Sequence, residues 1–211
     1  VVAIIPIKKK SKRIKGKNFR KINNKPLYTY LLSEIKKCNF DDVYIDSDSS
    51  QIKKYCKKQS FKFIQRKPSL ALDNANGNDL LNYHSKLIDA DIYFQLFVTS
   101  PTLKFTTINN CINILKKNKK YASIFTCKKI YSWFWFNGKP VNYNPKVLPR
   151  SQDAKAIVQE TTGLYGIRNR SLKKYKCRIG RDPYFYEVQN RESLDIDNLE
   201  DLNFFKFFIK K

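Results

Sequence analysis

The chain has 211 residues, of which 42% are hydrophobic and 14% aromatic, and this composition excludes an intrinsically disordered protein. Its 42 Lys and Arg residues outnumber its 18 Asp and Glu residues, which gives a formal net charge of +24. A basic excess is typical of proteins that contact nucleic acid or anionic surfaces. The lysines are nevertheless spread over the whole length of the chain, which is also typical of helix faces that are merely exposed to solvent. Charge alone therefore leaves open whether the lysines bind a polyanion or only face solvent.

Short apolar runs alternate with helical patterns up to Cys127. In chain order we predict strand 1–7, helix 26–38, strand 42–48, helix 49–60, strand 61–66, helix 77–88, strand 91–98, helix 106–117 and strand 121–127. This alternation predicts a three-layer α/β fold with a mostly parallel sheet. After Cys127 the pattern changes to short aromatic β segments, which predict a small β-rich insertion, and 199–209 is an apolar helix. We expect a single domain, residues 1–211.

The cysteines and the single histidine indicate the compartment and exclude one kind of site. Five cysteines without a CxxC spacing, together with His84 alone, do not form a zinc-binding pattern. We interpret His84 as a structural residue of its helix, and the thiols as reduced. No apolar segment is long enough to span a membrane or to act as a signal peptide. The sequence therefore predicts a cytoplasmic protein without membrane contact.

A cluster of six lysines and one arginine lies between Lys8 and Lys17, directly after the first predicted strand. In sheets of this kind, ligands bind at the carboxyl ends of the strands, where this segment would lie. Lysine ammonium groups suit phosphate oxygens, and Gly16 permits a tight backbone turn. We therefore favour a phosphate-binding loop over a detached polyanion-binding arm.

The residue pattern of this loop is more specific evidence of function than its charge. The pattern "IIPxxxxSKRIxGKN", followed by "NxKPL", resembles the first motif of the acylneuraminate cytidylyltransferases, the CMP-sialic acid synthetases and their relatives. Further segments resemble that family's later motifs in the same order: "IDSDS" (45–49), "QRKPSLALDNA" (65–75), "VTSPTLK" (98–104), "LPRSQD" (148–153), "TTGLYGI" (161–167) and "SLDIDNLEDL" (193–202).

The resemblance implies a Rossmann-like nucleotidyltransferase fold and a Mg²⁺-dependent reaction. The anomeric hydroxyl of an acidic 2-keto sugar would attack the α-phosphate of CTP, giving a CMP-sugar and pyrophosphate for glycan biosynthesis. The family also implies a homodimer. The aromatic segment 131–136 is expected to form core or a subunit contact rather than a base-stacking platform.

Carried over by position, the resemblance assigns roles to individual residues. Triphosphate contacts fall on Lys8, Ser11, Lys12, Lys17 and Asn18, and cytosine contacts on Arg66 with the backbone from Ala75 to Gly77. Asp195 and Asp197 fall on the family's metal-binding pair, and on an extended strand their side chains would point the same way. The alternative for this pair is a helix-capping turn. Catalytic roles are expected for Lys12, Lys17, Arg150 and Asp197.

Arg150 would bind a phosphate or the sugar carboxylate through its planar guanidinium, and the alternative is a surface ion pair. The sugar end of the pattern departs most from the family. Phe97-Val98 replaces a Gln-Pro pair, and Thr162 replaces an asparagine. At the nucleotide end, Lys8 replaces an arginine and Lys9-Lys10 replaces two glycines.

These departures favour an acidic sugar other than N-acetylneuraminate, either another nonulosonate or a Kdo-like octulosonate, and leave reduced activity open. The hypothesis from another class is a basic nucleic-acid or anionic-surface binding protein that reuses the fold without catalysis. The carboxylates of Asp195 and Asp197 argue against that alternative, because a polyanion binder has no use for them.

Overall fold

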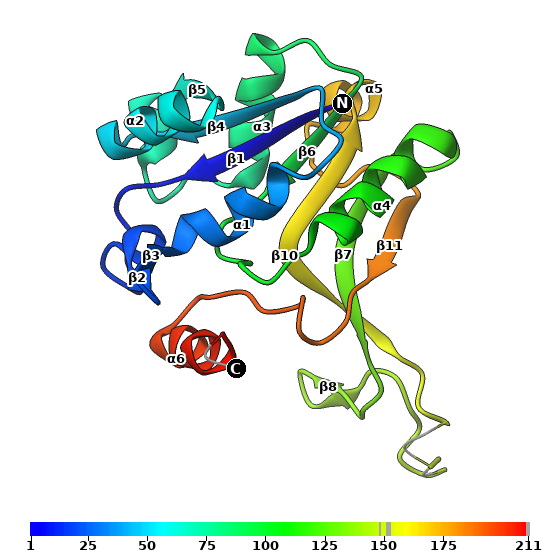
Figure 1. Cartoon of the computed structure of the whole chain (residues 1–211). Coiled ribbons are helices and arrows are strands. Elements are labelled where there is room, and N and C mark those ends of the chain that lie inside the picture. The colour runs from blue at the N-terminus through cyan, green and yellow to red at the C-terminus, as the bar shows by residue number, and fades with distance from the viewer. Residues whose placement is uncertain (148, 151–152, 210–211) are drawn as a thin grey trace.

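The computed structural model describes residues 1–147, 149–150 and 153–209, and its centre is a seven-stranded sheet (Figure 1). The strands are β1 Val2–Ile7, β4 Asp42–Ser47, β5 Lys62–Gln65, β6 Ile92–Leu96, β7 Ser123–Ile130, β10 Ile157–Arg168 and β11 Pro183–Glu187. Their order across the sheet is β11-β7-β10-β6-β1-β4-β5. Only β10 runs antiparallel to its neighbours. The predicted mostly parallel sheet is confirmed.

Helices cover both faces of this sheet. They are α1 Leu27–Ile35, α2 Ser50–Gln59, α3 Gly77–Leu87, α4 Phe105–Lys117, α5 Asn169–Tyr175 and α6 Leu199–Phe208. Side chains of α1, α2 and α4 pack on one face, and those of α3 and α5 on the other. Because successive side chains of a strand point to opposite faces, Ile5 of β1 joins the first core and Ile4 joins the second. The three-layer prediction is confirmed.

The structure differs from the sequence-based expectation in β10, which is one long strand rather than a short β segment. The expected β segment 163–167 is the part of β10 that contains its glycines, and the part that was missed is 157–162, where four successive polar residues leave no apolar pattern. A Cβ on Gly166 would lie 2.6 Å from the Phe94 ring and 2.7 Å from Ile124, so only glycine lets β10 lie between β6 and β7. The helix α5 that follows β10 was not predicted either.

The middle of β10 carries an irregularity that positions a polar side chain. Its register against β7 shifts between Glu160 and Tyr165. Within that interval Thr162 has a φ of 57°, a left-handed conformation that is uncommon for residues other than glycine and asparagine. The asparagine of the family pattern suits this backbone better than threonine does.

Beyond the sheet, β7 and β10 continue into an arm that projects away from the body (Figure 1). The arm carries a short hairpin of β8 Trp135–Phe136 and β9 Lys139–Pro140. Trp135 is 57% exposed and Phe136 is 71% exposed. Of the two expected roles, core is therefore wrong for these two residues, because the arm extends past the layers that would bury them, and a subunit contact stays a prediction.

Two observations bear on compartment and chemistry. All five cysteines are free thiols. Among the helices of the described ranges, none has the length and apolar character needed to cross a bilayer.

Candidate functional site

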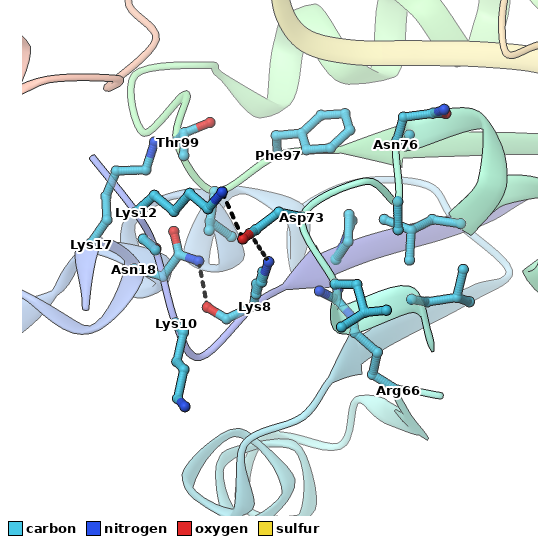
Figure 2. Close-up of a pocket in the computed structure, with 18 of the residues that line it drawn as sticks. Lys8, Lys10, Lys12, Lys17, Asn18, Arg66, Asp73, Asn76, Phe97 and Thr99 are labelled. Atoms are coloured by element: carbon cyan, nitrogen blue, oxygen red, sulfur yellow. Dashed lines mark hydrogen bonds and ion pairs between the residues drawn. The ribbon is translucent and has the colours of Figure 1, made fainter. Parts of the chain in front are cut away.

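A cavity of about 450 Å³ opens at the carboxyl ends of β1, β5 and β6 (Figure 2). The basic loop after β1 forms one side, and the residues that follow β6 form another. Predicted site residues that line it are Lys8, Ser11, Lys12, Lys17, Asn18, Arg66, Ala75 and Gly77. The loop lysines and the residues assigned to the base are thus brought together around one space.

Asp73 is an acidic partner of the basic loop that sequence reasoning missed. Its two carboxylate oxygens accept from Lys8 Nζ at 2.8 Å and from Lys12 Nζ at 2.9 Å (Figure 2). Hydrogen bonds from Lys8 and then Lys12 hold the pKa of the Asp73 carboxyl below its ordinary value. Because these groups are exposed, the pairs are weak, and a phosphate with more charge can compete for both lysines.

The residues at the carboxyl end of the loop are buried and are held in place by hydrogen bonds. Gly16 has a φ of 63° and begins the short 3₁₀ turn Lys17–Phe19. Asn18 Nδ2 donates to the Lys8 carbonyl at 3.0 Å, whereas Asn18 Oδ1 is buried without a hydrogen-bond partner. Lys17 is only 8% exposed, and its ammonium donates to the Ile196 carbonyl. The loop is therefore tied to a segment near the other end of the chain.

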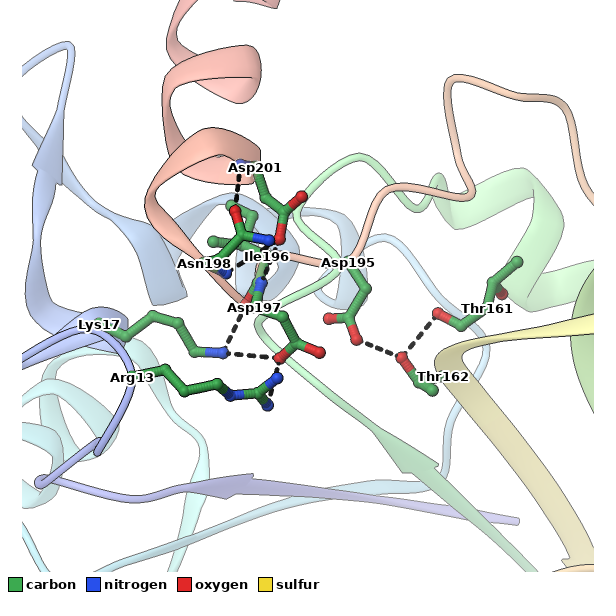
Figure 3. A network of polar contacts seen from close by, with 9 residues as sticks. All are labelled: Arg13, Lys17, Thr161, Thr162, Asp195, Ile196, Asp197, Asn198 and Asp201. Atoms are coloured by element: carbon green, nitrogen blue, oxygen red, sulfur yellow. Dashed lines mark hydrogen bonds and ion pairs between the residues drawn. The ribbon is translucent and has the colours of Figure 1, made fainter.

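That segment carries the predicted pair of aspartates. Asp197 accepts from Arg13 at 2.6 Å and from Lys17 at 3.3 Å (Figure 3). The backbone N–H of Ile196 donates to Thr99 O at 2.8 Å, just after β6. Cations from the start of the chain and a carboxylate from its end thus meet directly. Arg13, which lies in the "SKR" of the loop motif, was missed as a partner.

Asp195 points towards β10 instead. It accepts a hydrogen bond from Thr162 Oγ1, and its other oxygen, Oδ1, is buried without a partner (Figure 3). Asp195 and Asp197 line a second hollow of about 430 Å³. They lie on a segment outside the described strands, so the expected strand is wrong. The fully buried Ile196 between them keeps both carboxylates away from the core.

Asp197 joins the capping turn before α6 through its backbone, since Asp197 N donates to Asp201 Oδ2 at 2.8 Å, but neither aspartate side chain caps the helix. The cap of α6 is Asn198, whose side chain accepts from Asp201 N, while the Asp201 side chain accepts from Asn198 N. The carboxylates of Asp195 and Asp197 are left for other partners. The described residues contain no group of three or more His, Cys, Asp or Glu placed to hold a metal ion. Two carboxylates with one orphaned oxygen fit a Mg²⁺ that takes its remaining ligands from phosphate and water.

At the base end, Arg66 belongs to a buried network with two residues of other elements. Its Nε and Nη2 donate to Asp46 Oδ2 at 2.8 and 2.7 Å, and Nη2 also reaches the Asp46 carbonyl at 3.2 Å. His84 of α3 is fully buried, with Nε2 3.6 Å from the same Asp46 oxygen. Asp46, within the "IDSDS" segment, was not assigned this role from the sequence. It fixes two of the three guanidinium nitrogens.

Arg150 is a predicted site residue that lines neither the basic cavity nor the second hollow of Asp195 and Asp197. Its side chain is 80% exposed and pairs with Asp153 at 3.3 Å. The arm that carries it projects away from the carboxyl ends of β1 and β4 (Figure 1). The surface ion pair, which the sequence left open as the alternative, is the contact made within this chain.

Known proteins resemble this chain over nearly its whole length. The family model for cytidylyltransferases matches residues 2–208. A bifunctional protein of Helicobacter pylori, pseudaminic acid cytidylyltransferase and UDP-2,4-diacetamido-2,4,6-trideoxy-beta-L-altropyranose hydrolase, is 28% identical over 92% of this chain and 40% of its own length. N-acylneuraminate cytidylyltransferase A of Danio rerio is 24% identical over 93% of this chain and 48% of its own length. The chain thus spans about half the length of these curated relatives, or less.

Solved structures give the same fold. A CMP:2-keto-3-deoxy-manno-octonic acid synthetase complexed with CTP superimposes with a TM-score of 0.74 at 17% identity, covering 99% of this chain and 98% of that one. A 4-diphosphocytidyl-2C-methyl-D-erythritol synthase from Anaerococcus prevotii gives a TM-score of 0.70 at 10% identity, covering 100% of this chain and 96% of that one. The chain belongs to the cytidylyltransferase family.

Proposed function

We propose that residues 1–211 form the catalytic unit of a Mg²⁺-dependent cytidylyltransferase that joins CMP to an acidic 2-keto sugar. The anomeric oxygen forms a bond to the α-phosphorus of CTP, the bond from that phosphorus to the bridging oxygen breaks, and pyrophosphate leaves. The hydroxyl proton passes to solvent. The observation that carries this proposal is the contact of Arg13 and Lys17 with Asp197 beside the basic cavity.

The phosphate end would work by charge neutralisation. Negative charge grows on the leaving pyrophosphate, and such reactions depend on positioning and on electrostatic stabilisation. Lys8, Lys12 and Lys17 offer their ammonium groups to the triphosphate, and Ser11 and Asn18 add polar contacts. Asp195 and Asp197 would hold Mg²⁺, which supplies a Lewis acid for a phosphate oxygen when it is bound.

The base end would select cytosine. Arg66 Nη1 has no hydrogen bond in the described part of the chain, while Asp46 holds the other two nitrogens. Arg66 lines the cavity together with Ala75 and Gly77, whose backbone groups would face the base. A guanidinium held in one orientation loses little entropy when it binds a planar base edge.

The sugar we propose is a nonulosonate or a Kdo-like octulosonate. Two curated relatives are named for pseudaminic acid and for N-acylneuraminate, and one structural neighbour for 2-keto-3-deoxy-manno-octonic acid. All three name a sugar acid, which is the substrate class that a basic cavity suits.

We further propose that the unit works as a homodimer. Tyr131, Trp135 and Phe136 on the arm are 59%, 57% and 71% exposed, an apolar surface that a second copy would cover. In such a dimer the arm of one protomer would carry Arg150 to the cavity of its partner. A sedimentation mass equal to one chain at micromolar concentration would contradict this assembly.

The test of the reaction is pyrophosphate release from CTP and Mg²⁺ with N-acetylneuraminate, pseudaminate and Kdo offered separately. We expect release with at least one acid, and a larger rise in unfolding temperature with CTP than with ATP, GTP or UTP. Tight, salt-sensitive DNA binding without a preference for CTP would instead favour the polyanion-binding alternative, for which the net charge of +24 is the supporting observation.

A further inference from the structure

The proposed reaction assigns no role to Arg178, a cation beside Gly77 of the cavity lining. Arg178 lies in the connection between α5 and β11 and is half-buried. We propose that Arg178 binds the carboxylate of the acceptor sugar, and that Gln95 accepts a hydrogen bond from a neighbouring hydroxyl or acylamino N–H of the same sugar. This inference rests on the proposed function and names the part of the site that selects an acidic acceptor.

The Arg178 guanidinium lies over one aromatic ring and near a second. Its Cζ lies 3.6 Å from the centroid of the Tyr165 ring and 5.6 Å from that of Phe97. The Tyr165 hydroxyl donates to Glu160 at 2.6 Å, which holds that ring in place. A guanidinium stacked on a ring keeps its edges for bidentate hydrogen bonds, and a carboxylate is the ligand that matches this fork.

A glycine makes room for this arginine at the start of α3. A Cβ on Gly77 would lie 2.5 Å from Arg178 Nη1 and 3.2 Å from Gln95 Oε1. Gly77 and Phe97 both line the basic cavity. Arg178 and Gln95 therefore meet at the border of the space that we assign to the substrates.

Gln95 presents an unused acceptor at this point. It is fully buried, and its Nε2 donates to the Gly77 carbonyl at 2.9 Å. Its Oε1 is buried and has no hydrogen-bond partner. A buried acceptor without a partner is costly, so a donor from a bound ligand would stabilise it. A sugar that carries hydroxyl or acylamino groups beside its carboxylate supplies such a donor.

The charge of Arg178 is also uncompensated. No ion pair of this side chain is found among the described residues, and its guanidinium contacts the first residue of α3, where the helix dipole is positive. Asp79, the acidic residue of that first turn, is engaged by the backbone N–H of Asn76. A half-buried cation beside a helix amino terminus favours an anion as its neighbour.

The position of this corner separates it from the phosphates. Figure 2 shows Asn76 and Phe97 on the side of the cavity opposite Lys10 and Lys17, with Arg66 towards a third side. The triphosphate is assigned to the loop lysines, and Gly77, whose backbone we assign to the base, lies between the base and this corner. The remaining corner suits the acceptor, and its cation, its two aromatic rings and its buried amide fit a sugar acid better than another phosphate.

The experiment compares Arg178→Leu with Arg181→Leu, which removes an exposed arginine of the same connection. With the acid that best supports pyrophosphate release, we expect Arg178→Leu to raise the KM for the sugar about 10- to 100-fold. The KM for CTP and the CTP-induced rise in unfolding temperature should stay at the wild-type values. Arg178→Lys should recover part of the loss, and Arg181→Leu should behave as the wild type.

Gln95→Glu is the second variant, because the new carboxylate would pair with Arg178 in place of the carboxylate of the sugar. It should also raise the KM for the sugar while CTP still stabilises the protein. A KM for the sugar within twofold of the wild type in Arg178→Leu would overturn the inference and leave the proposed reaction standing.

If none of the three acids supports pyrophosphate release, binding is measured instead. N-acetylneuraminate, pseudaminate and Kdo are each titrated by calorimetry into protein saturated with CTP and Mg²⁺. Binding of one acid that is lost in Arg178→Leu would support the inference and contradict the reaction. Binding that Arg178→Leu leaves unchanged, or no binding of any of the three acids, would overturn the inference.

Discussion

The nucleotide end and the acceptor end that we propose for the cavity are built in different ways. The nucleotide end takes most of its cations from one loop, residues 8–18, and ties that loop to Asp197 through Arg13 and Lys17. The acceptor end is assembled from four separate elements that contribute Gly77, Gln95, Tyr165 and Arg178. The residues of the nucleotide end are therefore close together in the sequence, whereas those of the acceptor end are brought together only by the fold.

This contrast explains which part of the site the sequence could predict. The loop motif identifies residues that line the cavity, because they are close in the chain and follow a buried strand. Asp73 and Asp46 were missed because nothing in their local sequence marks them as partners of Lys8 or Arg66. Arg178 was missed because its significance comes from Gly77 and two rings that lie far from it in sequence.

The fold was predictable for a similar reason. Strands buried on both faces and amphipathic helices leave strong local periodicity, so β1, β4, β5, β6 and β7 and the helices α1 to α4 were located correctly. Of strand β10 only the segment 163–167 was expected, because the polar run 159–162 gives the first half of the strand no apolar pattern. Exposed aromatic residues such as Phe136 look like core in sequence, since composition does not reveal an arm.

The largest effect is expected from Asp197→Ala, which removes the carboxylate that joins the two ends of the chain. We expect pyrophosphate release to fall about a thousandfold, which corresponds to roughly 4 kcal/mol of charge stabilisation. The control is Glu200→Ala, an exposed residue of the same region, which should retain the rate. Excess EDTA should slow the wild type severely and add little to the loss in Asp197→Ala. Full activity in Asp197→Ala would remove this residue from the site.

Asp46→Ala tests whether the base end is preorganised. Removal of one partner from a buried ion pair costs about 3–5 kcal/mol, because Arg66 would remain buried and uncompensated. The unfolding temperature should therefore fall by many degrees, and the preference for CTP over UTP should shrink. Asp42→Ala, which breaks the more exposed pair with Lys62, should change the unfolding temperature little. Equal effects of the two substitutions would contradict the network at Arg66.

Gly77→Ala tests where the nucleotide end of the cavity stops and the acceptor end begins. The new Cβ would displace Arg178 Nη1, which is the flexible end of a side chain, so the fold should be retained. We expect the KM for the sugar to rise about tenfold with a smaller change in the KM for CTP. Steady-state kinetics with each substrate varied in turn measures both values. A larger loss for CTP would place Gly77 at the nucleotide end alone.

The smallest effect is expected from Asp73→Asn. The pKa of Asp73 is lowered by Lys8 and Lys12 in the folded protein, so its contribution to stability is present above the ordinary carboxyl pKa and is lost as the pH falls through the lowered value. At neutral pH the variant should lower the KM for CTP about twofold, because both lysines are released for phosphate. An increase in this KM would show that Asp73 assists nucleotide binding.

The most direct test of the central claim is a calorimetric titration of CTP into the wild type and into Asp197→Ala, each with Mg²⁺ and with EDTA. If the loop cations and the carboxylates of Asp195 and Asp197 surround one magnesium-bound nucleotide, Mg²⁺ will tighten CTP binding to the wild type at least about tenfold and will have little effect on the variant. An identical response to Mg²⁺ in both proteins, or CTP binding that is indifferent to Mg²⁺ in the wild type, would contradict the account.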